Sequence, residues 1–143
     1  MPHPTDTPTR IGVTGYSGRP FDRDEGLRLL VEALDQVVRE HPAGSYTLVS
    51  GWTDLGIPAL AYREAQRRGW RTVGIACPLA REYACFPVDE EHVIGADWGD
   101  ESAFFLANID VLVRVGGGGQ ALREAAAFRG PKVERELAET PRG

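Results

Sequence analysis

The chain has 143 residues, a length that suits one domain with a real hydrophobic core and is short for two. Its formal net charge of -5, with both signs interspersed and no basic cluster, argues against nucleic acid or an anionic membrane surface as a partner. The chain has no apolar stretch of membrane-spanning length and begins without a signal-peptide pattern, so we expect a cytoplasmic protein.

The N-terminal part predicts a tail, a strand and a helix. Residues 1–9 are polar and rich in proline and threonine, and we expect a disordered tail there, followed by a single domain over residues 10–139. Residues 11–15 have the short apolar pattern of a buried strand. Asp22, with Glu25 three positions later, resembles a capping box and precedes apolar residues at helical spacing, which predicts one amphipathic helix.

The middle of the chain predicts two more strands around a second helix. Residues 46–50 and 72–76 are short apolar runs typical of buried strands. The helix between them is expected to begin near Gly56 and to end at Gly69. A long, irregular segment follows at residues 77–99, and loops of this length in compact domains are usually functional or mobile.

The C-terminal part continues the alternation of strands and helices. Within the irregular segment only residues 92–94 resemble a strand, and a short helix is expected next, with Gly99 or Asp100 near its cap. Residues 111–115 predict a further strand, which leads through a glycine turn into another helix. Residues 132–137 fit an edge strand or a frayed helix, and their periodicity does not decide between the two.

The alternation predicts an α/β protein with three layers, a Rossmann-like parallel sheet of about five strands with helices on both faces. Ligands of such sheets bind at the carboxyl ends of the strands, where the strand order reverses. The loops that leave those ends are therefore the candidate binding loops.

The most informative of these loops is the glycine turn after residues 111–115. Glycine backbone that ends in the free N–H groups of a helix start lets an anion approach closely and meet the positive end of the helix dipole. A tight turn seldom needs four glycines, so we predict a phosphate-binding turn. Its residues are Gly116, Gly117, Gly118, Gly119 and Gln120.

Two other loops carry groups suited to a nucleotide. After the first strand, Ser17 offers a hydroxyl, and Arg19 is either a forked cation for phosphate or a solvated surface charge. After the second strand, Trp52 could stack on a base or pack in the core, and Asp54 could accept ribose hydrogen bonds or cap a turn. The candidate ligand-binding residues of these loops are Gly15, Tyr16, Ser17, Gly18, Arg19, Gly51, Trp52, Thr53 and Asp54.

Several other classes of site are not indicated. A Walker motif needs lysine and then Ser or Thr after its last glycine, where Gln120 and Ala121 stand, and no Gly-x-Gly-x-x-Gly fingerprint follows the first strand. Cys77, Cys85 and His92 lack the spacing of a closed zinc site, and two cysteines are too few for a disulfide scaffold. No metal site or cofactor is predicted, although Mg²⁺ could accompany phosphates.

The motifs together resemble the SLOG superfamily of Rossmann-like nucleotide-binding proteins over about residues 11–128. They are Val-Thr-Gly after the first strand, the stretch from Ser50 to Gly56, and the stretch from Ile109 to Glu124. The superfamily includes Lonely Guy phosphoribohydrolases, proteins once classed as lysine decarboxylases, molybdenum-cofactor carrier proteins and nucleotide-sensing domains. The resemblance implies a nucleotide ligand and, as is common in the superfamily, a homodimer.

The hydrolase branch carries the motif Pro-Gly-Gly-x-Gly-Thr-x-x-Glu, and alignment keeps its glutamate as Glu124 but puts Gln120 and Ala121 at its third glycine and threonine. The same register places Glu101 where the hydrolases have an arginine, and a carboxylate there would repel phosphate unless a cation intervened. The candidate catalytic residues are Glu124, Glu101 and Asp100, although a helix dipole alone also favours acidic residues at a helix start.

Two functions follow from this pattern. The preferred one is binding of a nucleotide or nucleotide derivative by a carrier, sensor or sequestering module without turnover. The alternative is a phosphoribohydrolase, an N-glycosidase that releases a base from a nucleoside monophosphate through these carboxylates. A weaker third reading is a subunit of a larger assembly with a vestigial pocket, and the sequence leaves open whether the protein is an enzyme.

Overall fold

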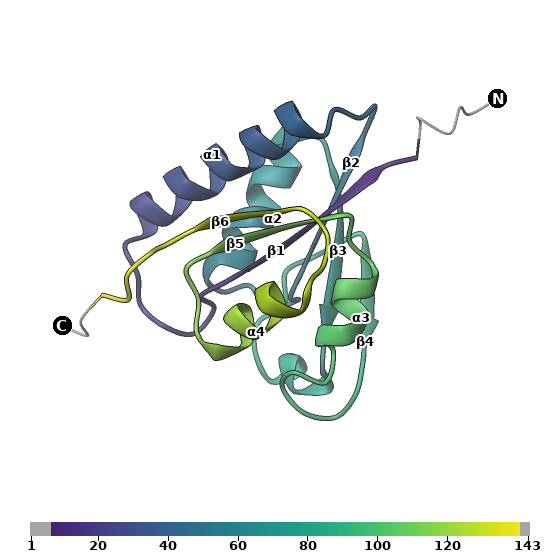
Figure 1. The fold of residues 1–143 in the computed structure, drawn as a ribbon. Helices are drawn as coiled ribbons and strands as arrows, with labels where there is room; N and C mark the ends of the chain where they lie inside the picture. The colour runs from purple at the N-terminus through teal and green to yellow at the C-terminus, as the bar shows by residue number, and fades with distance from the viewer. Residues whose placement is uncertain (1–6, 141–143) are drawn as a thin grey trace.

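The computed structural model describes residues 7–140 and has one six-stranded parallel sheet, in the order β4-β3-β2-β1-β5-β6 (Figure 1). The predicted α/β class is therefore confirmed. The sheet has one strand more than the five or so expected, because residues 132–135 pair with β5 as an edge strand. The strands are β1 (Thr9–Gly15), β2 (Tyr46–Ser50), β3 (Arg71–Ala76), β4 (Glu90–Val93), β5 (Val111–Val115) and β6 (Lys132–Arg135).

Helices cover both faces of this sheet (Figure 1). On one face, α1 (Arg23–Glu40) and α2 (Gly56–Arg68) bury a large apolar cluster that includes Leu34 and Val113. On the other face, the much shorter α3 (Ser102–Ala107) and α4 (Gly119–Ala127) pack over a smaller one. The three predicted layers are therefore present.

Local signals set the ends of the long helices. The Asp22 carboxylate accepts a hydrogen bond from the Glu25 backbone N–H at 3.0 Å and caps the start of α1, as its sequence predicts. Helix α2 ends at Gly69, which adopts φ 76° and donates its backbone N–H to carbonyls of the last helical turn. Glycine adopts this left-handed conformation without strain.

The structure differs from the sequence prediction in two places. Of the predicted tail, residues 1–6 lie outside the described residues, and Thr9 already belongs to β1. The irregular segment 77–99 contains a 3-10 helix, Pro78–Glu82, as well as the short β4. The N-cap residue of α3 is Glu101, next to Asp100, so the predicted start of this helix is correct to within one residue.

The order of the strands places a crevice between β1 and β5. From β1 the chain moves outward through β2, β3 and β4, and then crosses to the opposite side of β1 to form β5 and β6. The strand order therefore reverses between β1 and β5, where parallel sheets of this kind bind ligands. No helix within residues 7–140 has both the length and the apolar character needed to cross a membrane.

Candidate functional site

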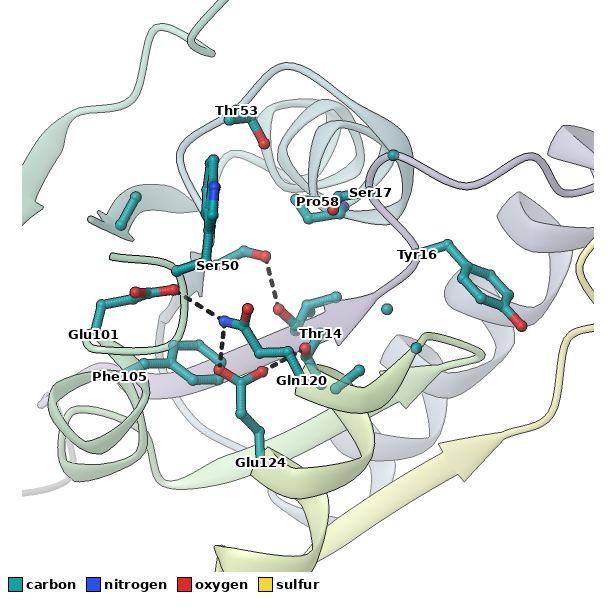
Figure 2. A pocket seen from close by; sticks show the side chains of 18 of the residues that line it. Thr14, Tyr16, Ser17, Ser50, Thr53, Pro58, Glu101, Phe105, Gln120 and Glu124 are labelled. Carbon is teal, nitrogen blue, oxygen red and sulfur yellow. Dashed lines mark hydrogen bonds between the residues drawn. The ribbon is translucent and has the colours of Figure 1, made fainter. Parts of the chain in front are cut away.

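A cavity of about 480 Å³ lies at the carboxyl end of the sheet, at the reversal between β1 and β5 (Figure 2). Its wall combines the loops after β1 and β2, the end of β3, Pro58 of α2, Phe105 of α3 and the first turn of α4. This volume falls within the usual range for small-molecule sites.

The four glycines after β5 divide into two pairs. Gly116 and Gly117 have φ of 59° and 109°, which favour glycine, and a Cβ on Gly117 would lie 2.5 Å from the Cβ of Ala121. These two residues form the turn and do not line the cavity, whereas Gly118 and Gly119 do. Nη1 of the buried Arg114 also donates to the Gly116 carbonyl at 3.0 Å, and this contact anchors the turn.

The start of α4 forms one end of the cavity. Gly118 is its N-cap residue, and no side chain within residues 7–140 caps the helix there. The N–H groups of a first helical turn have no partners within the helix, and they carry the positive end of its dipole. The Arg19 guanidinium lies beside this end, because a Cβ on Gly118 would be 3.6 Å from Arg19 Nε. This end of the cavity is therefore suited to an anion.

The loop after β1 lies alongside the start of α4. Gly15, Tyr16, Ser17, Gly18 and Arg19, the candidate binding residues of this loop, all line the cavity. The loop is tied to α2, whose Ile57 N–H donates to the Tyr16 carbonyl at 2.7 Å. Arg19 also pairs with Glu139 at 3.3 Å, but both side chains are largely exposed, so this ion pair holds the guanidinium weakly.

The loop after β2 brings Gly51, Trp52 and Thr53 to the cavity. The buried Tyr62 hydroxyl lies 2.5 Å from the Gly51 carbonyl oxygen, and burial raises the pKa of Tyr62 well above its usual value, so this hydroxyl stays protonated. The Trp52 ring packs over Gly74 of β3, where a Cβ would lie 3.1 Å from it. Asp54 does not line this cavity and instead pairs with Arg63 at 3.5 Å.

Glu124 forms part of the cavity floor and is held by hydroxyl groups (Figure 2). Its Oε1 accepts a hydrogen bond from Thr14 Oγ1 at 2.7 Å, and its Oε2 accepts one from Ser102 Oγ at 2.8 Å. The side chain is buried, with 6% of its surface exposed. Strand β1 and helix α3 thus fix the orientation of a carboxylate that α4 supplies.

Gln120 joins Glu124 to a second buried carboxylate, Glu101 (Figure 2). The Gln120 amide nitrogen donates to Glu101 Oε1 at 2.9 Å and approaches Glu124 Oε2 at 3.5 Å. The other oxygen of Glu101 accepts the Gly99 N–H at 3.1 Å. The structure therefore brings together three residues that the sequence singles out, and all three line the cavity.

Asp100 is not brought to the cavity, although it is a predicted catalytic carboxylate. It accepts hydrogen bonds from the backbone N–H groups of Ala96 and Asp97, each at 2.9 Å. These two bonds lower the pKa of the Asp100 carboxyl. The side chain therefore holds together the loop that precedes α3.

Sequence reasoning misses three hydroxyl residues around the site, Thr14, Ser50 and Ser102. Thr14 and Ser102 hold Glu124, and Ser50 Oγ donates to the Val13 carbonyl at 2.6 Å. Thr14 is the last residue but one of β1, and Ser50 is the last residue of β2. A polar side chain at the carboxyl edge of a parallel sheet is the signal that could have identified both.

No metal centre is evident in the part of the chain that the structure describes. No group of three or more His, Cys, Asp or Glu side chains there lies close enough together to hold a metal ion. Cys77 and Cys85 are both free thiols, and burial raises the pKa of each.

Comparison with known proteins places the chain within a structural class. No protein-family model and no curated protein matches the sequence. A molybdenum cofactor binding protein from Rippkaea orientalis has a TM-score of 0.71 at 20% identity, over 89% of this chain and 76% of that one. The molybdenum cofactor carrier protein of Chlamydomonas reinhardtii has a TM-score of 0.67 at 24% identity, over 90% of this chain and 76% of that one.

At such identities the likeness establishes the fold. The chain has the Rossmann-like fold of these molybdenum cofactor proteins, which agrees with the fold that the SLOG resemblance implies.

Proposed function

We propose that this protein binds a phosphate-bearing nucleotide or nucleotide-derived small molecule, as a carrier, sensor or sequestering module. The observation that carries the proposal is the anion-suited end of the cavity, where the uncapped first turn of α4 lies beside Arg19. The cavity also lies at the reversal of strand order and has room for a ligand of this size.

The contacts of Glu124 favour binding over turnover. A carboxylate that acts as nucleophile or general base must present an oxygen to the substrate or to water. Glu124 Oε2 already accepts from Ser102 and faces the Gln120 amide, and Oε1 accepts from Thr14, so about one of its four acceptor positions is left for a substrate or water. The cavity has Glu101 where the hydrolase motif places an arginine, and Arg19 is the single cationic side chain among its lining residues in the described part of the chain. Phosphoribohydrolysis is therefore the alternative.

The structural neighbours widen the set of ligands to be tested. Their names refer to the molybdenum cofactor, so a phosphorylated pterin belongs in the panel beside nucleotides.

We also propose that the protein acts in the cytoplasm as a homodimer. Light scattering coupled to size exclusion tests the dimer, and a monomer at micromolar concentration would contradict it.

The direct test is ligand retention. The protein is mixed with nucleoside mono-, di- and triphosphates and a pterin phosphate, with and without Mg²⁺, and is then freed of unbound molecules and denatured for mass spectrometry. An intact ligand in stoichiometric amount supports the proposal, whereas a free base with ribose phosphate would establish the hydrolase. A saturating ligand at about 100 times its Kd should also stabilise the fold by about 2.7 kcal/mol.

A pair of arginine variants makes the retention test specific for this cavity. Arg19→Gln removes the cation beside α4 and should weaken binding of the retained ligand. Arg28→Gln removes an exposed arginine on α1, which covers the opposite face of the sheet, and should leave binding unchanged. If no ligand is retained and none shifts the melting temperature, the proposed function is wrong.

A further inference from the structure

The floor of the cavity contains two buried carboxylates without a cationic partner. Glu101 and Glu124 are each 6% exposed, and neither forms an ion pair with any residue in the range 7–140. Buried carboxylates are costly unless donors or cations compensate for the water they have lost. Both glutamates line the cavity, so a ligand could supply what the protein does not.

The two carboxylates differ in how many acceptor positions remain open. A carboxylate can accept about four hydrogen bonds. Glu124 has two short bonds from hydroxyl groups and a longer contact from Gln120. Glu101 has one bond to each oxygen, from the Gln120 amide and from the Gly99 N–H. Glu101 therefore keeps one open acceptor position on each of its two oxygens, whereas Glu124 keeps one, on Oε1.

We propose that Glu101 is a specificity-determining residue that accepts two adjacent hydrogen-bond donors from the ligand. The inference rests on the proposed function and deepens it. The ligand is then bipolar, with its phosphate at the start of α4 beside Arg19 and its donor-rich end at Glu101. Glu124 is a positioning residue, because its Oε2 contacts the Gln120 amide nitrogen, and that nitrogen in turn donates to Glu101 and orients it (Figure 2).

A cation between the two carboxylates would fit this arrangement less well. The Gln120 amide faces acceptors on both sides, which assigns its nitrogen rather than its oxygen to the space between them. An N–H group in that space repels a metal ion, and the described residues offer no third acidic, histidine or cysteine ligand. Neutral donors on the ligand compensate the Glu101 carboxylate without these conflicts.

Two chemical groups of a nucleotide present adjacent donors. One is the ring N–H with the neighbouring amino group of a guanine-type base, and the other is the vicinal diol of ribose. Both match the two oxygens of one carboxylate. Matched ligands separate them, because inosine monophosphate lacks the amino group of guanosine monophosphate, and 2′,3′-dideoxyguanosine monophosphate lacks the diol.

Titration calorimetry with these three nucleotides and with inorganic pyrophosphate tests the inference on the wild-type protein and on Glu101→Gln. In the wild type, one of the two deletions should weaken binding about tenfold or more, because it leaves an acceptor position of the buried Glu101 carboxylate unfilled in the complex. In Glu101→Gln, guanosine monophosphate should bind more weakly than in the wild type. The ligand deletion that weakens binding to the wild type should cost less affinity in this variant. Glu82→Gln, an exposed site in the 3-10 helix, is the matched control and should behave as the wild type.

Pyrophosphate separates this role from a purely structural one. Loss of a negative charge from the cavity should leave pyrophosphate binding to Glu101→Gln as tight as in the wild type or tighter. Equal weakening of pyrophosphate and guanosine monophosphate would assign Glu101 to the fold and overturn the inference. The wild-type comparison of the three nucleotides does not depend on how well the variant folds.

The remaining outcomes distinguish the two proposals. If guanosine monophosphate binds the wild type no more tightly than pyrophosphate, or if neither deletion matters, the role of Glu101 is wrong and the anion site stands. If neither pyrophosphate nor any nucleotide binds the wild type, the proposed function fails and the inference falls with it.

Discussion

The two faces of the sheet are built differently, and the site belongs to the less covered one. Helices α1 and α2, with 18 and 13 residues, bury one face under a large apolar cluster. Helices α3 and α4, with 6 and 9 residues, pack over a smaller apolar cluster on the other face. The cavity includes the buried polar side chains Glu101 and Glu124 from this side. We therefore expect the first face to supply more of the stability, because it buries more apolar surface, while the other holds groups whose burial costs stability.

The largest expected effect comes from the well-covered face. Leu34→Ala removes a fully buried side chain of α1 and should lower the free energy of unfolding by about 2–5 kcal/mol. Urea denaturation measures the loss. The control is Leu122→Ala on α4, where a leucine is 50% exposed and the expected change is within about 0.5 kcal/mol. Equal losses in the two variants would mean that the faces do not differ in this way.

A smaller effect is expected where the glycine turn meets the site. Gly117→Ala would place a Cβ 2.5 Å from Ala121 at φ 109°, and we expect it to cost about 1–3 kcal/mol and to weaken pyrophosphate binding by displacing the start of α4. Gly118→Ala is the matched control for stability, because its backbone is extended and the nearest atom to its Cβ, on Arg19, lies 3.6 Å away. A Gly118→Ala variant as unstable as Gly117→Ala would contradict the division of the turn into structural and binding pairs.

The fold was predictable where the signals are local. The alternation of apolar runs and helical periodicity predicts the strands, and the caps at Asp22 and Gly69 mark the ends of the long helices because each acts within one turn. Residues 132–137 were ambiguous, since a short edge strand such as β6 is decided by its pairing with β5 rather than by its own pattern.

The site was predictable only in outline. Topology brings the loops after β1, β2 and β5 to one edge, so most of the predicted binding residues do meet. The bond between Thr14 and Glu124 joins residues 110 positions apart, and no spacing rule can indicate it. Asp100 and Glu101 are neighbours of the same chemical class, yet one binds the backbone of its own loop and the other faces the cavity.

The smallest expected effect is on the pH dependence of stability, and it tests whether Asp100 acts through its bonds to the loop backbone. Hydrogen bonds from Ala96 and Asp97 lower the pKa of Asp100, so their stabilising effect is complete above the unfolded pKa of about 4 and is lost as the pH falls through the lower folded value. Asp100→Asn should therefore melt slightly below the wild type at pH 7, and the difference should close between about pH 5 and pH 3.

Melting curves recorded from pH 3 to pH 7 measure this difference, and a gap that does not change with pH would show that the charge of Asp100 is not what matters. The same loop carries Trp98 and the Gly99 N–H that binds Glu101. Asp100→Asn should therefore weaken the binding of guanosine monophosphate more than the binding of pyrophosphate, because it loosens the loop that holds Glu101 and leaves the start of α4 intact.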